Sequence, residues 1–149
     1  MINYPKQISK SDQERLRAAP VLIFLLLVAP SGQEAAERQK QAFSAVLRGA
    51  DQVPSPLFAA ALSDAAEHYE MIRAAFAGRV LDPSVELLVV CGVLKRLPVT
   101  SDEVEEYRQG LVFLADAVAR AGARRSWFGR RVSRENRELL ALLRGMLAA

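Results

Sequence analysis

The sequence predicts an all-α fold, a compact single-domain bundle of about six helices with one or two apolar helices at its centre. Three observations favour this fold. Helix-start signals recur along the chain, apolar residues recur at intervals of three and four, and residues 21–29 and 87–94 are apolar on every side. The chain has 149 residues and no Gly/Ser-rich linker, so we expect one domain over 1–149, with 1–10 as a loose N-terminal segment.

Six positions carry the signals of a helix N-terminus. Three have the pattern of a capping box, in which a hydroxyl accepts a bond from the backbone N–H three residues later and a Glu there bonds back. Two precede a proline, which suits the first helical position because the N–H that it lacks would have no partner there. The last precedes an acidic first turn. The expected N-cap residues are Ser11, Ser31, Ser55, Asp82, Thr100 and Ser133.

The first apolar run, residues 21–29, predicts a buried core helix. Pro20 either ends a short leading helix or kinks a longer one, and Pro30 stops the helix that follows. Nine apolar residues are too few to span a membrane, which takes roughly 20. A cleaved secretory signal over residues 1–31 is the alternative, since basic residues precede the run; Asp12 and Glu14 argue against it.

Amphipathic stripes account for the other helices. The second apolar run, residues 87–94, predicts a helix buried on all sides; its β-branched residues permit a strand, but the flanking caps favour a helix. Cys91 reads as a small core residue, beside a Gly92 that allows close helix approach. The stripes are Phe58, Leu62, Ala65, Tyr69, Ile72 and Phe76; Val104, Tyr107, Leu111, Leu114 and Val118; and Leu139, Leu140, Leu143, Met146 and Leu147.

The sequence offers few residues that could carry out catalytic chemistry. One cysteine excludes an intramolecular disulfide and an all-cysteine zinc site, and none of the common phosphate-binding, dinucleotide or hydrolase motifs occurs. Asp64 and His68 lie one helical turn apart, near Glu67 and Glu70, and could share a metal or a proton. We interpret them instead as a solvated flank, and expect no catalytic residue, no metal, no cofactor and no small-molecule substrate.

Charge is strongly segregated in the last third of the chain. The total charge of +3 is too small to favour obligate nucleic-acid binding. Residues 101–119, however, hold five acids and one base, whereas residues 120–137 hold seven arginines and one acid. The helix dipole explains the arginines at a helix C-terminus, but not Arg130, Arg131 and Arg134, which precede or open the next helix.

The basic segment is a candidate site for an anionic partner. Arginines interleaved with aromatic residues suit phosphate contact with base stacking, or an anionic membrane surface. The alternative is that Trp127 and Phe128 plug the end of the bundle and leave the arginines in water. The candidate residues are Arg124, Arg125, Trp127, Phe128, Arg130, Arg131 and Arg134.

The order of these features resembles the tellurite-resistance TerB-like helical family of bacteria. Residues 20–24 match its Pro-initiated apolar helix and residues 28–32 the turn after it; residues 114–119 and 127–135 match its late helix and its Gly- and Phe-containing loop. Where the family has Ala-Asp-Gly, this chain has Pro30-Ser31-Gly32, and Arg38 stands where a family Glu would fall, although Glu34 and Glu37 are near. The resemblance implies the helical fold and a stress-related setting, but no metal ligands carry over.

These observations lead us to expect a non-enzymatic, cytoplasmic TerB-like module that binds a protein partner or assembles with itself. The alternative is a peripheral binder of anionic membrane or nucleic acid through the Arg124–Arg137 segment. A small enzyme built around Asp64 and His68 ranks third.

Overall fold

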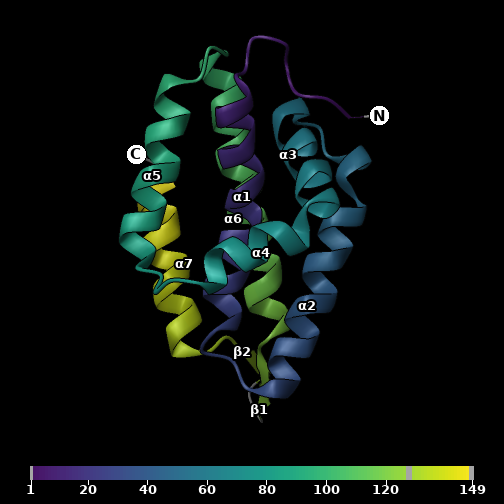
Figure 1. The fold of residues 1–149 in the computed structure, drawn as a ribbon. Helices are drawn as coiled ribbons and strands as arrows, with labels where there is room; N and C mark the ends of the chain where they lie inside the picture. The colour runs from purple at the N-terminus through teal and green to yellow at the C-terminus, as the bar shows by residue number, and fades with distance from the viewer. Residues whose placement is uncertain (1, 127–128, 148–149) are drawn as a thin grey trace.

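The computed structural model describes residues 2–126 and 129–147, and within them the all-α prediction is confirmed. Seven α-helices pack side by side, and a short antiparallel hairpin joins the last two (Figure 1). No helix in these ranges is both long and apolar enough to cross a membrane. The elements are α1 (Lys10–Val28), α2 (Gln33–Arg48), the 3-10 turn η1 (Ala50–Gln52), α3 (Pro56–Glu67), α4 (Tyr69–Ala77), α5 (Pro83–Arg96), α6 (Ser101–Ala121), β1 (Arg124–Ser126), β2 (Gly129–Arg131) and α7 (Arg134–Leu147).

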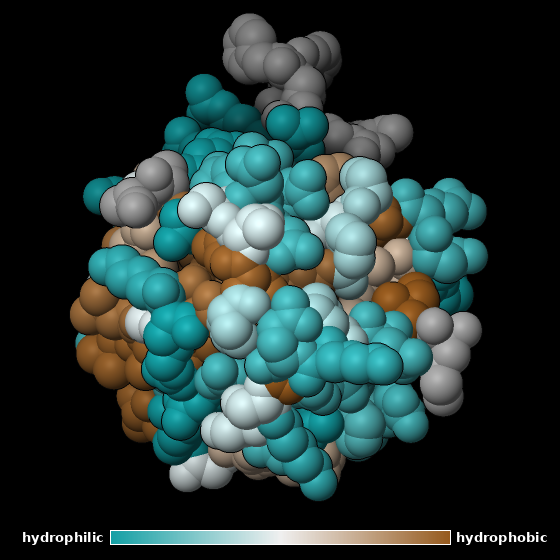
Figure 2. All heavy atoms as spheres, turned by 90° about the horizontal axis from the view of Figure 1, so that it is seen from above, coloured by the Kyte–Doolittle hydropathy of each residue, from teal (hydrophilic) through white to brown (hydrophobic). Residues whose placement is uncertain are grey.

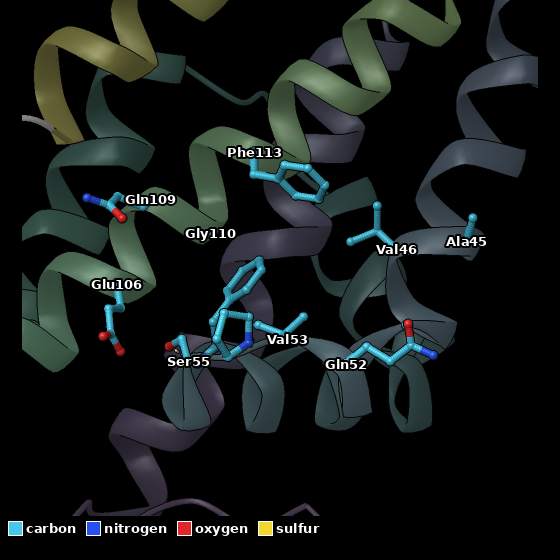
Figure 3. Close-up of a pocket in the computed structure, with 12 residues that line it drawn as sticks. Ala45, Val46, Gln52, Val53, Ser55, Glu106, Gln109, Gly110 and Phe113 are labelled. Carbon is cyan, nitrogen blue, oxygen red and sulfur yellow. Dashed lines mark hydrogen bonds between the residues drawn. The ribbon is translucent and has the colours of Figure 1, made fainter.

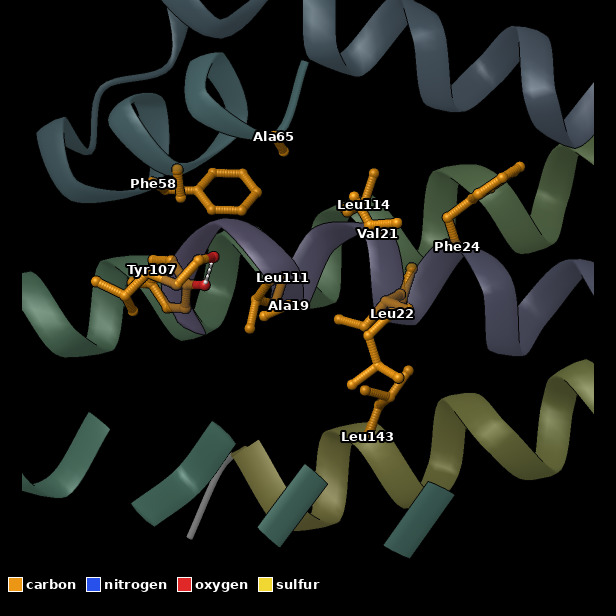
Figure 4. Close-up of a cluster of buried hydrophobic side chains, with 14 of the residues drawn as sticks. Ala19, Val21, Leu22, Phe24, Phe58, Ala65, Tyr107, Leu111, Leu114 and Leu143 are labelled. Atoms are coloured by element: carbon orange, nitrogen blue, oxygen red, sulfur yellow. Dashed lines mark hydrogen bonds between the residues drawn. The ribbon is translucent and has the colours of Figure 1, made fainter. Parts of the chain in front are cut away.

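Helix α1 is the centre of the bundle and contacts each of the other six α-helices. Its apolar run is buried, as the sequence predicts: Val21 and Leu27 have no exposed surface, and the Phe24 ring stacks on Phe43 of α2 with 4.5 Å between ring centroids. Around it the side chains of α3, α6 and α7 close the core (Figure 4).

Pro20 lies inside α1, so the longer-helix alternative holds. Proline has no N–H, and its position therefore leaves the carbonyl of Leu16, four residues earlier, without its helical donor. The hydroxyl of Tyr107, fully buried on α6, donates to that carbonyl at 2.7 Å (Figure 4). A side chain of the neighbouring helix thus satisfies the group that the proline leaves unpaired, and it ties α6 to α1.

Four of the six predicted helix starts are confirmed. Asp82, Ser55 and Ser133 accept bonds from first-turn N–H groups, and Thr100 with Glu103 forms the complete capping box.

The predicted starts at Ser11 and Ser31 are wrong. Helix α1 begins earlier, because the Ser9 hydroxyl accepts from the N–H of Asp12 at 3.1 Å. The Ser31 hydroxyl donates instead to the carbonyl of Leu27, and Gly32 precedes α2 without a side-chain cap.

The stripe expected as one helix between residues 58 and 76 is divided into two. His68 leaves the helical conformation, with φ −112° and ψ 18°, and so ends α3 and begins α4. The break turns the chain, and α4 crosses the face of α1 (Figure 1).

Helix α5 lies at the edge of the bundle, which corrects the expectation of a second fully buried helix. It packs mainly against α1 and α7, so only one of its faces is covered. Leu87, Val93 and Leu94 are buried, but Leu88 is 62% exposed and Val89 is 45% exposed. In Figure 2, apolar side chains gather at the edge of the molecule where α5 lies in Figure 1.

Two further expectations concern α5 and the N-terminus. Cys91 is buried, as expected, but a Cβ on Gly92 would meet nothing within 4 Å, so this glycine serves no close approach between helices of the described chain.

The N-terminal segment, expected to be loose, packs on the bundle: Ile8 is buried in the core, and the Tyr4 hydroxyl donates to Asp64 of α3.

Candidate functional site

An apolar groove of about 700 Å³ lies between α2 and α6. Its walls are the last turns of α2 and the middle of α6, and its floor is the segment from η1 to the start of α3. Figure 3 shows Phe113, Val46 and Val53 pointing into the space between the two helices. This volume lies in the range of ligand-binding clefts, roughly 300–1,000 Å³.

Packing of α2 against α6 explains where the groove opens. The two helices run antiparallel and approach closely at one end, where Arg38 donates to the carbonyl of Ala121 and a Cβ on Gly122 would lie 2.7 Å from Gln39. The Arg38 guanidinium therefore lies at the negative end of the α6 dipole, where a positive charge is favourable. Further along α2, the groove occupies the space between the helices.

Gly110 sets the floor of the groove. The Phe58 ring lies directly against the α6 backbone, and a Cβ at position 110 would be 2.4 Å from its nearest ring carbon. The same ring meets Tyr107 edge-on, with 5.7 Å between centroids. A glycine is therefore required on this turn of α6 for Phe58 to close the groove from below.

One side chain gives the groove its exposed apolar surface and another its charge. Phe113 on α6 is 63% exposed although it is large and apolar. Among the described lining residues, Glu106 is the one with a charged side chain, and Gln109 lies between the two on the same face of α6. The groove is thus apolar, with one acidic end.

The apolar pattern of the sequence does not reveal this groove. The stripe used to predict α6 runs through Tyr107, Leu111 and Leu114, and Phe113 falls outside it. A large aromatic residue off the buried stripe, three residues after a mid-helix glycine, was the available signal. It could not reveal the groove alone, because α2 supplies the opposite wall.

The predicted anionic-partner segment forms the hairpin β1–β2. Its register places Arg124 opposite Arg131 and Arg125 opposite Arg130. The backbone register therefore brings four of the predicted positions together across one hairpin.

The other residues of that prediction lie differently. Arg134 is exposed at the start of α7, and its guanidinium pairs with Glu138 at 3.0 Å, so part of its charge is already balanced. Arg131 is exposed. Trp127 and Phe128 lie outside the described residues.

Asp64 and His68 are close together, as their spacing predicts, but they belong to a polar network. The Asp64 carboxylate lies 2.8 Å from His68 Nδ1, accepts from the Tyr4 hydroxyl at 3.1 Å and pairs with Arg17 of α1 at 3.5 Å. The Asp64 side chain is 16% exposed and that of His68 is 35% exposed, so Asp64 lies deeper than the expected solvated flank. Burial, with the nearby Asp64 charge, raises the pKa of Tyr4 well above its ordinary value.

Ligand geometry for a metal exists here, but the network opposes a cation. One atom each of Asp64, Glu67 and His68 lies within 4.8 Å of the others. The Arg17 guanidinium, however, already faces the Asp64 carboxylate, and the Tyr4 hydroxyl occupies its second oxygen. These contacts join the N-terminal segment, α1 and α3, so we assign the cluster a structural role.

Comparison of the chain with family models, with curated proteins and with solved structures gives no match. The resemblance to the TerB-like family therefore rests on the sequence motifs alone.

Proposed function

We propose that the protein is a non-enzymatic interaction module whose groove between α2 and α6 receives an apolar helix of a protein partner. The observation that carries this proposal is the exposed ring of Phe113 on the wall of an apolar groove of about 700 Å³. Large aromatic residues are enriched at the centres of protein interfaces. Grooves between two helices accept an amphipathic helix through side chains spaced three, four and seven residues apart.

The acidic end of the groove narrows the kind of partner. Glu106 is the charged lining residue, and Glu105 and Asp102 are exposed on the adjoining turns of α6. A partner helix with an apolar face and a basic end complements this surface. From the TerB-like resemblance, we also propose a cytoplasmic, stress-related setting in bacteria.

Capture from a lysate of the source organism tests the groove. The wild-type chain, Phe113→Glu and the control Met71→Glu serve as baits; Met71 is 55% exposed on α4, away from the groove. We expect a partner that is retained by the wild type and by the control but lost with Phe113→Glu. A benzophenone side chain at Gln109 is expected to crosslink to a segment with apolar residues at helical spacing. Equal capture by Phe113→Glu, or a crosslink to a non-helical segment, would overturn the proposal.

A second candidate is the anionic-partner role of the hairpin. The backbone pairing of four arginine positions in one hairpin supports it, because arginines gathered in a short segment form a basic patch that attracts phosphate groups. The test compares binding to anionic vesicles and to an oligonucleotide across a salt titration, for the wild type and for Arg130→Glu with Arg131→Glu. Loss of binding in the variant, with a steep salt dependence in the wild type, is the expected result. Unchanged binding to both probes would remove this candidate.

A further inference from the structure

We propose that the helix received by the groove is α5 of a second copy of this chain, so that copies assemble head to tail. This inference rests on the proposed function of the groove. The occupant follows from two surfaces of the same molecule, one on α5 and one on α6, which match in apolar character, in charge and in spacing.

Helix α5 presents an apolar stripe that no other described part of the chain covers. Val85, Leu88 and Val89 are exposed, whereas Leu87 and Leu94 of the same helix are buried in the core. Leu88 is the most exposed of the three, and Val89 also borders a hollow beside Leu22 of α1. Gly92 continues the stripe with open space around it. A glycine inside an exposed helix is unfavourable by about 1 kcal/mol relative to alanine, so its position favours close approach by another molecule.

The stripe ends in positive charge. Lys95 is exposed one turn after Gly92, so Leu88, Gly92 and Lys95 follow one another at intervals of four and three on a single face. The stripe is therefore apolar in its first half and basic at its end, and it complements a groove that is apolar with one acidic end.

The α6 wall of the groove carries the complementary series in the opposite direction. Phe113, Gln109 and Glu106 follow one another at intervals of four and three toward the helix N-terminus, and all three are exposed. Seven residues separate Leu88 from Lys95, and seven separate Phe113 from Glu106, a span of roughly 10 Å on each helix.

Antiparallel docking of α5 on α6 brings these two series into register. Leu88 then lies beside Phe113, Gly92 lies beside Gln109, and the ammonium of Lys95 meets the carboxylate of Glu106. An opposite orientation would place Lys95 beyond Phe113 and leave Glu106 without a base, so the charges select one direction.

The positions of the two surfaces determine the form of the assembly. Helix α5 lies at one edge of the bundle, beside α7, whereas α2, which forms the other wall of the groove, lies at the opposite edge (Figure 1). Contact between two different surfaces is heterologous, and it extends into an open chain of copies unless the rotation closes a ring. One helix in a groove buries less than the roughly 800 Å² per partner of a stable complex, so we expect a Kd on the order of 100 μM.

Sedimentation velocity of the full chain over a range of concentrations tests the proposal. The average mass of the wild type is expected to rise with concentration past that of a dimer. Leu88→Glu and Phe113→Glu, both at exposed positions that leave the core intact, are expected to abolish this rise. Met71→Glu, which adds the same charge at a comparably exposed site outside both surfaces, is expected to behave as the wild type.

Mixing the two disabled variants gives a sharper result. The Phe113→Glu chain keeps its stripe and the Leu88→Glu chain keeps its groove, so an equimolar mixture is expected to form dimers and nothing larger. Lys95→Glu is expected to weaken assembly a few-fold, and Glu106→Lys in the same chain to restore it.

Several outcomes would overturn the proposal: a wild type that stays monomeric to millimolar concentration, a mixture that stays monomeric, or single variants that assemble like the wild type. Failure of self-assembly can be distinguished from failure of the proposed function. A monomeric wild type whose Phe113→Glu variant loses a captured partner would refute self-assembly and retain the groove as a docking site. Assembly with no effect of Phe113→Glu would refute α5 as the occupant of the groove, and the capture and crosslinking test would still decide the proposed function.

Discussion

Helices α1 and α5 carry apolar runs of similar length, yet they occupy opposite kinds of position in the molecule. Helix α1 contacts every other α-helix and buries its run, whereas α5 contacts mainly α1 and α7 and leaves Leu88 and Val89 in contact with solvent. The apolar composition of a helix therefore sets the largest area that it can bury, whereas the number of neighbouring helices determines the area that it does bury. Surface left over on a peripheral helix is then available to another molecule.

The largest expected difference between the two helices is in core truncation. Leu27→Ala on α1 removes a side chain with no exposed surface and should lower the free energy of unfolding by about 2–5 kcal/mol. Leu88→Ala on α5 should change it by no more than about 0.5 kcal/mol. Urea denaturation of both variants measures this contrast. Equal losses at the two positions would contradict the peripheral placement of α5.

Glycines sharpen the comparison between covered and uncovered helix faces. Gly110→Ala drives a Cβ into the Phe58 ring and should destabilise the protein by about 1–3 kcal/mol. Gly92→Ala meets open space and should stabilise the monomer by about 0.5–1 kcal/mol through helix propensity. Urea denaturation measures both values. If the expected loss is found, Phe58→Leu in the Gly110→Ala background should recover part of it. A neutral Gly110→Ala would instead mean that Phe58 moves aside without cost.

The bond that holds α6 to the centre of α1 can be isolated with a double-mutant cycle. Tyr107→Phe leaves the buried carbonyl of Leu16 without a donor and should cost about 1–3 kcal/mol. In a Pro20→Ala background the new backbone N–H bonds to that carbonyl, so the same substitution should cost less. The free energy of unfolding of the four proteins gives the coupling. An identical cost in both backgrounds would show that Tyr107 does not compensate for Pro20.

Alkaline pH should lower the free energy of unfolding through the two tyrosines Tyr107 and Tyr4. Burial raises the pKa of Tyr107, and burial together with Asp64 raises that of Tyr4, above the ordinary value near 10. Above about pH 10 the unfolded chain loses these protons while the folded chain keeps them, so stability is full below that pH and falls as pH rises through it, by about 1.4 kcal/mol per pH unit for each tyrosine. Urea midpoints between about pH 8 and 11 measure the fall. Tyr107→Phe should reduce the slope by one tyrosine, and an unchanged slope would contradict this assignment.

Much of the fold could be predicted because its signals are local. The caps at Ser55, Asp82 and Thr100 depend on residues within one turn, and the run around Phe24 is long enough to require burial. The break at His68 could not be predicted, because the hydrophobic period continues through it and the turn in the chain reflects the packing of α4 across α1.

The candidate site was harder to predict, because its parts are distant in sequence. The groove requires Val46 of α2 and Phe113 of α6, whose pairing depends on how two helices approach. The arginine cluster can be predicted from the charges in the sequence. The strand register that pairs positions 125 and 130 cannot, because it depends on backbone hydrogen bonds between the two strands and not on local composition.

The single cysteine is a native probe for local opening of α5 at the edge of the bundle. The Cys91 thiol is buried between α5 and α7, 3.6 Å from the carbonyl of Met146. A thiol reagent reaches it only when that seam separates, so the rate of labelling reports local opening of α5 against the rest of the bundle. Any molecule that docks on α5 should slow that rate, which makes the native chain its own sensor of occupancy.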